Sequence, residues 1–201
     1  MSNLLWILMA FGCGALPFSL WVGQLALRKD IRAYGDGNPG ATNVFRAGGR
    51  LLGFTAFLLD TLKGTVPVGY AYFFAGVTGP LMVAVALAPI LGHAFSPFLR
   101  FRGGKAVAVT FGVWVGLTIW EIPTFSGLLL LYWFKVIKVS GWAVMCACAS
   151  ILLYLLLTRF DPLLLAVWAG STAILAYTHR ADLRQAPTLR EDAWVRKVLA
   201  R

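Results

Sequence analysis

The chain is dominated by long runs of apolar residues, which are interrupted by short segments that hold its charges. A helix needs about 20 mostly apolar residues to cross the hydrocarbon core of a bilayer. In lipid, only helices and closed barrels satisfy all of their backbone hydrogen bonds. Such runs therefore predict membrane-spanning helices, and there are seven of them, at residues 3–27, 51–74, 80–97, 106–120, 124–134, 140–157 and 162–178.

Composition favours an integral membrane protein over a soluble one. Of the 201 residues, 59% are hydrophobic and only 13% are charged, whereas soluble domains carry about 25% charged residues. Seven spans would use about 140 residues and leave almost no length for a soluble domain. We therefore expect residues 1–201 to form one polytopic domain, an all-α bundle of seven transmembrane helices in which residues 1–27 provide the first.

The basic residues set the expected orientation, because lysine and arginine concentrate in cytoplasmic loops. If the N-terminus lies outside, nearly all of the 18 basic residues fall inside, in loops 28–50, 98–105 and 135–139 and in the tail from Arg180. Residues 106–134 taken as one helix would give six spans and place that tail outside, so the charge pattern favours seven. We expect the C-terminus and the functional site at the cytoplasmic face. The net charge of +10 then reflects topology and predicts no nucleic-acid partner.

The first inside loop contains a glycine-rich segment, GDGNPGATNVFR, from Gly35 to Arg46. Closely spaced glycines let a backbone approach a ligand, and the segment leads into an expected helix whose free N–H groups favour anions. A guanidinium group matches the geometry of phosphate. The alternative is a turn with ordinary cytoplasmic arginines. The candidate residues are Asp36, Gly37, Asn38, Gly40, Thr42, Asn43 and Arg46.

The second inside loop follows residue 92 and ends in a Gly-Gly-Lys sequence that is expected to open a helix. Backbone amides followed by a lysine resemble a phosphate loop, although the spacing is not that of nucleoside triphosphatases. A basic, aromatic membrane anchor is the alternative, because three regularly spaced phenylalanines precede the glycines. The candidate residues are His93, Gly103, Gly104 and Lys105, and for His93 a structural role is equally open.

Charged groups outside the two loops are further candidates. A histidine at the cytoplasmic end of the last run can orient a ligand or move a proton, which singles out His179 and, beside it, Asp182. A basic helix that binds lipid headgroups is the alternative for this tail. Within the second run, Asp60 and Lys63 share a helix face, and we favour a structural ion pair over direct contact with a ligand.

The candidates share one expected face of the membrane. Both glycine-rich segments, both histidines and the cations Arg46, Lys105 and Arg180 would face the cytoplasm from a bundle held in lipid. Such an arrangement suits a ligand with one anionic end and one fatty end. It predicts an enzyme that joins a water-soluble phosphate compound to an acyl chain. The three cysteines lie in apolar runs and two histidines alone do not make a metal site, so no metal is expected.

At these residues the chain resembles the acyl-phosphate:glycerol-3-phosphate acyltransferase (PlsY) family of bacteria, over essentially its whole length. The family pattern G-S-G-N-x-G-A-T-N-x-x-R is matched by residues 35–46 except at its second position, and G-H-x-x-x-x-F-x-x-x-x-G-G-K is matched by residues 92–105. The pattern D-x-x-K-G is matched at residues 60–64. The tail pattern H-R-x-N with a later glutamate is matched by His179, Arg180 and Glu191, but its asparagine is Asp182 here.

The resemblance implies transfer of an acyl group from acyl phosphate to the sn-1 hydroxyl of glycerol 3-phosphate. The products would be lysophosphatidic acid and phosphate, in the first acylation of phospholipid synthesis at the cytoplasmic membrane. It implies membrane lipid as surroundings, and neither a cofactor nor an obligate protein partner. The implied residues are Asp36, Arg46, His179 and Asp182 for catalysis, Gly37, Asn38, Gly40, Thr42, Asn43, Lys63, His93, Gly103, Gly104 and Lys105 for binding, and Asp60 and Glu191 for support.

Two aspartates stand where the family pattern has neutral residues, namely Asp36 for serine and Asp182 for asparagine. A carboxylate beside phosphate costs energy unless it pairs with a cation or stays protonated, and a nearby guanidinium is the expected partner. A changed acceptor or a loss of activity is the alternative meaning of these substitutions. A transporter of small phosphorylated solutes and a non-catalytic lipid-binding protein are the other functions that remain open.

Overall fold

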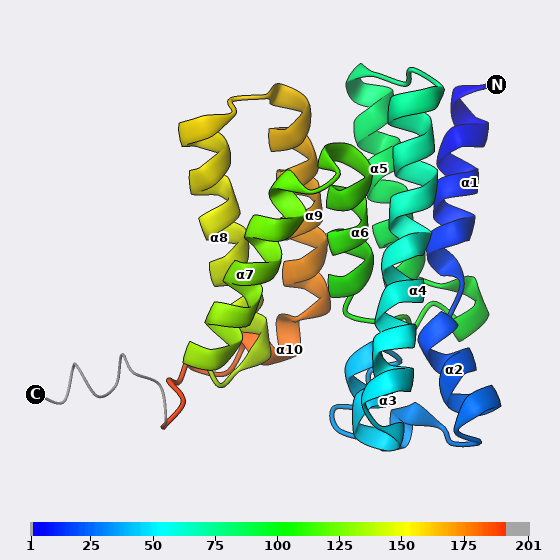
Figure 1. The fold of residues 1–201 in the computed structure, drawn as a ribbon, viewed down its shortest axis with the longest axis vertical. Coiled ribbons are helices and arrows are strands. Elements are labelled where there is room, and N and C mark those ends of the chain that lie inside the picture. Colours follow the sequence, from blue (N-terminus) through cyan, green and yellow to red (C-terminus); the bar gives the residue numbers. More distant parts are fainter. Residues whose placement is uncertain (1, 192–201) are drawn as a thin grey trace, which may run out of the picture. The chain divides into compact units, whose positions relative to one another are not determined.

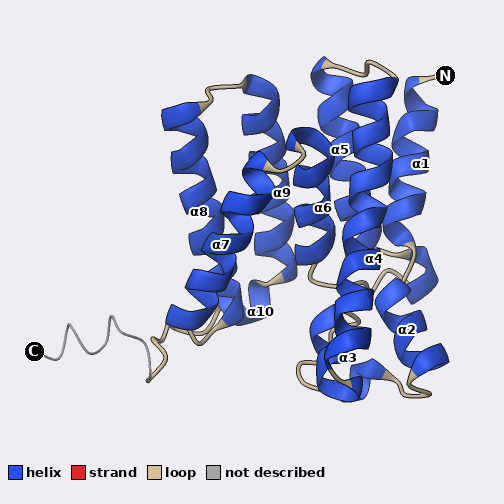
Figure 2. Ribbon diagram, in the orientation of Figure 1, coloured by secondary structure: helices blue, strands red, loops and turns tan. Residues whose placement is uncertain are grey.

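The computed structural model describes residues 2–191. By its internal contacts the chain forms two compact units, Met1–Ile119 and Trp120–Arg201, and in the described residues both are built from helices (Figures 1 and 2). Each of the seven predicted apolar runs is helical. The main helices are α1 (Asn3–Ala15), α2 (Phe18–Ala26), α3 (Ala41–Gly48), α4 (Arg50–Gly69), α5 (Gly79–Ala94), α6 (Val107–Thr118), α7 (Glu121–Val136), α8 (Ser140–Thr158) and α9 (Pro162–Thr178), with a short α10 (Arg180–Leu183) after them.

Several of these helical segments are long and apolar enough to cross a membrane. In the described part of the chain there are four of them, Asn3–Ala26, Arg50–Phe74, Gly79–Leu99 and Ser140–Thr158. The helices α6 and α9 are apolar but shorter. The all-α membrane class is therefore confirmed, while the count of seven spans stays a prediction.

The first apolar run is not one continuous helix, which corrects the expectation for residues 1–27. It breaks at Leu16, whose backbone is extended with ψ of 123°, because the residue before a proline is disfavoured in the α conformation and Pro17 follows. Two of the carbonyl groups at the break accept hydrogen bonds from side chains. Ser96 Oγ donates to the Ala15 oxygen at 2.6 Å and Lys63 Nζ donates to the Leu16 oxygen at 2.7 Å.

Glycines bring the long helices of the first unit close together. A Cβ atom added at Gly112 on α6 would lie 1.9 Å from the carbonyl oxygen of Thr61 on α4, and one at Gly14 on α1 would lie 2.2 Å from that of Pro89 on α5. Small residues permit such close backbone contact between membrane helices. The tight α1–α5 and α4–α6 pairs form the frame on which the loops of this unit are mounted.

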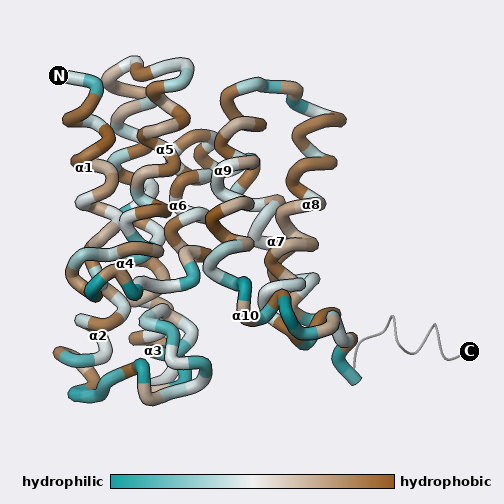
Figure 3. The backbone as a smooth tube through the Cα atoms, turned by 180° about the vertical axis from the view of Figure 1, so that it is seen from behind, coloured by the Kyte–Doolittle hydropathy of each residue, from teal (hydrophilic) through white to brown (hydrophobic). Residues whose placement is uncertain are grey.

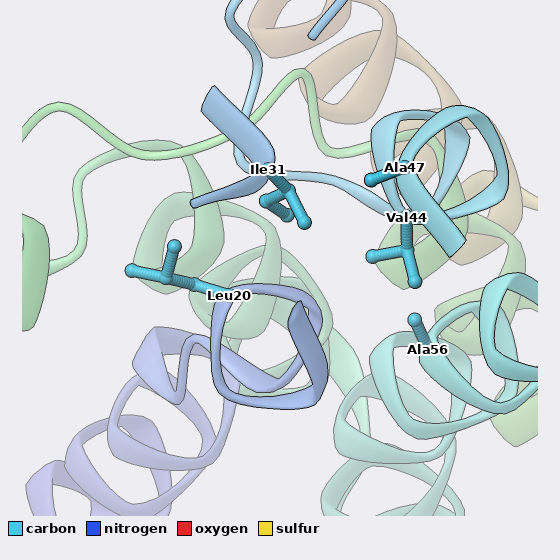
Figure 4. Packing of buried hydrophobic residues seen from close by; sticks show 5 residues of the cluster. All are labelled: Leu20, Ile31, Val44, Ala47 and Ala56. Atoms are coloured by element: carbon cyan, nitrogen blue, oxygen red, sulfur yellow. The ribbon is translucent and has the colours of Figure 1, made fainter. Parts of the chain in front are cut away.

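A small apolar cluster supports the first glycine-rich loop. Side chains from α2, from the turn Ile31–Ala33, from α3 and from α4 point toward one another in Figure 4, and Ile31 and Val44 are fully buried. Burial of such side chains stabilises by about 1.5–3 kcal/mol each. The chain that joins α2 to α3 is mostly hydrophilic in Figure 3, so little of it is buried by its own side chains. The apolar cluster holds it in place, and its buried members are Leu20, Ile31, Val44, Ala47 and Ala56.

The second unit contains α7, α8, α9 and α10. The break between α6 and α7 falls at Ile119–Trp120, where the sequence places a glutamate and a proline inside an apolar stretch, so residues 106–134 are two helices rather than one. Glu121 at the start of α7 accepts a hydrogen bond from Tyr154 and pairs with Arg159. Asp161 caps α9 by accepting from the N–H groups of the second and third helical residues.

Candidate active site

The first glycine-rich segment folds into a compact loop before α3. Gly35 and Gly37 have φ of +59° and +72°, in the left-handed region that residues with a Cβ rarely adopt. These two turns direct the carboxylate of Asp36 back toward the chain. Its Oδ1 atom accepts from the Asn38 backbone N–H at 3.3 Å and from Asn43 Nδ2 at 3.0 Å.

Asn43 is the buried centre of this loop, with 1% of its surface exposed. Its amide nitrogen donates both to Asp36 and to the Asn38 carbonyl oxygen at 2.9 Å, and its oxygen accepts from Arg46 Nη1 at 2.9 Å. Arg46 also lies against Gly35, because a Cβ there would be 1.8 Å from Nη1. Asn43 thus holds the loop and directs the guanidinium of Arg46, one helical turn further along α3.

The Gly-Gly-Lys sequence is shaped by its contact with the end of α5. The N–H groups of Gly103 and Gly104 donate to the carbonyl oxygens of Ala94 and His93, both at 3.1 Å. A Cβ on Gly103 would lie 1.9 Å from the His93 oxygen, and one on Gly104 would lie 2.2 Å from His93 Nε2. Only glycine permits this approach. His93 is buried against these glycines, and Lys105 lies two residues before the start of α6 at Val107.

The two glycine-rich segments meet at Lys105. Its backbone N–H donates to Asn38 Oδ1 at 3.0 Å, and its ammonium lies 2.9 Å from Asp36 Oδ2. The cation that pairs with Asp36 is therefore a lysine, where an arginine was expected. Partial burial raises the pKa of the Asp36 carboxyl, but Lys105 and the N–H donors outweigh burial and hold this pKa below its ordinary value.

Asp60 and Lys63 form the expected ion pair inside the first unit. The Nζ–Oδ1 distance is 2.7 Å and both side chains are 2% exposed. Ser19 donates a short hydrogen bond to the other carboxylate oxygen, Oδ2, and Lys63 also bonds the Leu16 carbonyl. These contacts join α4 to the α1–α2 break, so they favour the structural interpretation of the pair. A contact of Lys63 with substrate stays a prediction.

The tail candidates belong to the second unit, whereas the residues just described belong to the first. His179 is buried at the end of α9, with Nδ1 at 2.8 Å from the Leu175 oxygen. Asp182 Oδ2 accepts from Ser140 Oγ at 2.7 Å. Glu191 is exposed at the end of the described residues. Because each unit is defined separately, the roles of His179, Asp182 and Glu191 at a common site stay predictions.

Sequence analysis missed the serines that complete these networks. Ser19 bonds Asp60, Ser96 bonds the Ala15 carbonyl and Ser140 bonds Asp182. Each is a single hydroxyl beside or within an apolar run, and the only available signal was the rule that buried polar groups need partners. That rule indicates that a partner exists but does not say which residue it is.

The first unit thus presents a candidate site for an anion. Two cations, Lys105 and Arg46, and two glycine-rich loops come together at one end of a helical unit, where the side chains of Thr42 and Arg46 are exposed. Guanidinium, ammonium and loop N–H groups are the usual ligands of phosphate. Fold and site together define a polytopic helical membrane protein that handles a phosphate-bearing compound.

Comparison with known proteins gives the family. Residues 4–187 match the family model of glycerol-3-phosphate acyltransferase. The chain is 36% identical over 199 residues to glycerol-3-phosphate acyltransferase 1 of Thermotoga maritima, and the aligned region covers 92% of this chain and 98% of that protein. It is 35% identical to the glycerol-3-phosphate acyltransferase of Maridesulfovibrio salexigens, which covers 96% of this chain and 97% of that protein.

Solved structures agree with this result. The crystal structure of PlsY, an integral membrane glycerol 3-phosphate acyltransferase, in its glycerol 3-phosphate form is 31% identical, with a TM-score of 0.81 over 92% of this chain and 91% of that one. The lysophosphatidic acid form gives 30% identity and a TM-score of 0.80. The chain therefore belongs to the glycerol-3-phosphate acyltransferase family of integral membrane enzymes.

Proposed function

We propose that this enzyme transfers an acyl group from acyl phosphate to the sn-1 hydroxyl of glycerol 3-phosphate, forming lysophosphatidic acid and inorganic phosphate. The observation that carries the proposal is the meeting of two glycine-rich segments at Lys105 and Asp36, with Arg46 held beside them by Asn43. Both substrates bear phosphate groups, and a site with two cations where two glycine-rich loops meet suits them.

The chemistry needs positioning more than activation. The hydroxyl oxygen attacks the acyl carbonyl carbon, the new ester C–O bond forms, and the bond from the acyl carbon to the phosphate oxygen breaks. Phosphate is a good leaving group, so cations that stabilise the developing charge and hold the two substrates in line supply most of the catalysis. The hydroxyl proton passes to a base, for which His179 and a phosphate oxygen of the substrate are the two candidates.

The proposed topology has seven spans, the N-terminus outside, and the active site and C-terminus at the cytoplasmic face of the cell membrane. The separation of α6 and α7 at Ile119–Trp120 supports seven spans over six. Single cysteines placed in a chain without Cys13, Cys146 and Cys148 test this arrangement. In intact cells, an impermeant maleimide should label Ala75→Cys and Phe160→Cys but not Lys138→Cys. Labelling of Lys138→Cys from outside would restore the six-span alternative.

The activity is tested with purified protein in detergent, palmitoyl phosphate and glycerol 3-phosphate. We expect lysophosphatidic acid and phosphate to appear in equal amounts, and Arg46→Ala and Lys105→Ala each to reduce both by about 100-fold or more. Arg32→Ala is the matched control, because Arg32 lies in the same loop but pairs with Asp30 at the surface. Phosphate release without acylated product would retain the donor and reject this acceptor.

The sequence alone left open a transporter of phosphorylated solutes, an alternative that membership of the acyltransferase family disfavours. Transporters place their polar groups along a path through the bilayer, whereas the described contacts of Lys105 and Arg46 gather in loops at one end of the first unit. Uptake of glycerol 3-phosphate into sealed proteoliposomes that lack acyl phosphate would favour transport. Absence of uptake together with acyl transfer would support the enzyme.

A further inference from the structure

Asp36 is the position at which the first glycine-rich segment departs from the family pattern, and it is also the residue that joins this segment by charge to the second one. Here a carboxylate lies 2.9 Å from the ammonium of Lys105. A residue that changes the charge of a phosphate site by one full unit alters what that site binds.

The carboxylate is held as a bound anion would be held. Oδ2 faces the Lys105 ammonium, while Oδ1 accepts from the Asn38 backbone N–H and from the Asn43 amide. Asn43 is buried and also fixes Arg46. Lysine ammonium, side-chain amide and loop N–H are the donors that phosphate oxygens use, so Asp36 occupies donors that a substrate phosphate needs.

The pair is also reachable from solvent. The side chain of Lys105 is 23% exposed and that of Asp36 is 44% exposed. Half-exposed ion pairs contribute little net free energy because water competes for both partners. An entering dianion can therefore take the place of the carboxylate without dismantling the fold.

We propose that Asp36 is a built-in counter-ion, which occupies Lys105 in the ligand-free enzyme and competes with the phosphate group of a substrate. The proposal rests on the proposed function, since it assigns a specificity-determining role at the same site. Substrate binds only when Lys105 is released from Asp36, so the apparent dissociation constant equals the intrinsic constant divided by the fraction of enzyme in which these two side chains are separated. The carboxylate weakens substrate binding and favours departure of the product phosphate.

The alternative is that Asp36 acts on the reacting atoms, for instance as the base. Its distance of 2.9 Å from an ammonium speaks against this, because a carboxylate that is already neutralised by a cation is a weak proton acceptor. The two roles differ in what they do to kinetics. A competitor raises KM, whereas a base raises kcat.

The experiment compares the wild-type enzyme with Asp36→Asn and Asp36→Ser. Asp30→Asn is the matched control, because it removes a carboxylate from the same loop that pairs with Arg32 and not with Lys105. With both substrates varied, we expect the Asp36 variants to lower the KM of one phosphate substrate by about two- to fivefold, with kcat within about twofold, and Asp30→Asn to change neither. The substrate whose KM falls is the one that Lys105 holds.

A binding measurement makes the test independent of turnover. Inorganic phosphate is titrated against each purified protein, and its dissociation constant is obtained from the rise in thermal unfolding temperature. We expect tighter phosphate binding in both Asp36 variants and an unchanged constant in Asp30→Asn. If the wild type transfers no acyl group, the proposed function fails while this titration still decides the role of Asp36.

Three outcomes would overturn the inference. Phosphate binding that is unchanged or weaker in Asp36→Asn would show that the carboxylate does not compete with the anion. A loss of kcat of about 100-fold at unchanged KM would make Asp36 a catalytic residue. Equal effects of Asp30→Asn and Asp36→Asn would show that the net charge of the loop, and not the pairing of Asp36 with Lys105, controls phosphate binding.

Discussion

The first unit contains two aspartate–lysine pairs of similar length that serve different ends. Asp60 and Lys63 lie on one face of α4, 2.7 Å apart, with both side chains 2% exposed. Asp36 and Lys105 come from separate loops, 2.9 Å apart, with side chains 44% and 23% exposed. The chemistry of the charged groups is the same, so their surroundings account for the difference in role.

The buried pair is completed by the protein itself. Ser19 donates to Asp60 and Lys63 donates to the Leu16 carbonyl, so each charge has a second fixed partner. Removing one member of a buried pair leaves an uncompensated charge, which is strongly destabilising. Asp36 also accepts from Asn38 and Asn43, but its pair with Lys105 is open to solvent, and in the role that we propose for Asp36 a ligand can replace the carboxylate. If Asp36 acts as the counter-ion that we propose, burial separates an ion pair that holds the fold from one that exchanges with a ligand.

The largest effect is expected from Lys63→Met. It leaves the Asp60 carboxylate buried without its cation and removes the bond to the α1–α2 break, so unfolding should become easier by about 3–5 kcal/mol. The free energy of unfolding is measured by titration with sodium dodecyl sulfate, followed by the fluorescence of the eight tryptophans. The double variant Asp60→Asn/Lys63→Met should recover part of the loss, because it carries no isolated charge. A double variant less stable than Lys63→Met would contradict a buried-charge penalty.

Next in size is the loss of activity in Lys105→Met. This variant should lose about 100-fold in rate, since a positioned charge on a transferring phosphate group is missing. Its free energy of unfolding should change by about 1 kcal/mol or less, because the pair that it breaks is partly exposed. Rate and unfolding are measured on one preparation. A stability loss as large as that of Lys63→Met would erase the distinction between the two pairs.

The sequence predicted the helices and the short-range ion pair of this comparison better than the long-range contacts between its loops. The apolar runs identified every main helix outside the loops. They did not reveal that the first run is divided into two helices at Leu16–Pro17. Pro17 lies inside the first run and favours a helix break, but the continuous hydrophobicity of the run favoured a single helix in the sequence analysis. The i, i+3 spacing placed Asp60 and Lys63 together because a helix fixes the geometry of near neighbours.

The pairing of Asp36 with Lys105 could not be derived in the same way. The two residues lie in loops on either side of α3, α4 and α5, so their contact depends on how α5 turns back and on the approach of Gly103 and Gly104 to His93. Motif spacing identified both segments as phosphate-binding candidates. It gave no information on which cation would meet Asp36, and an arginine was expected. Long-range contacts follow from packing, which local patterns do not contain.

A smaller effect is expected from Ser19→Ala, which tests the environment of the buried pair and leaves its charges unchanged. Asp60 loses a hydrogen bond to one carboxylate oxygen, and hydrogen bonds to charged groups contribute about 1.5–3 kcal/mol. The loss should be smaller than for Lys63→Met and should leave kcat within about twofold, because Ser19 bonds Asp60, a residue of the ion pair that we interpret as structural. The same detergent titration measures it, with Ser2→Ala as the control. An unchanged stability would mean that water or another group replaces the hydroxyl.

The smallest effect is expected at a third pair, which lies in the second unit. Glu121 pairs with Arg159 while their side chains are 28% and 44% exposed, an exposure close to that of Asp36 and Lys105. If exposure decides the role, Glu121→Gln should cost about 1 kcal/mol or less, even though Glu121 also accepts a bond from Tyr154. A double-mutant cycle with Arg159→Gln isolates the pair from the tyrosine contact. A coupling energy of about 3 kcal/mol or more would be typical of a buried pair. It would show that the lipid interface, and not solvent, surrounds these charges. The exposed fraction of a side chain in the protein without lipid would then not predict how readily its ion pair is exchanged for a ligand.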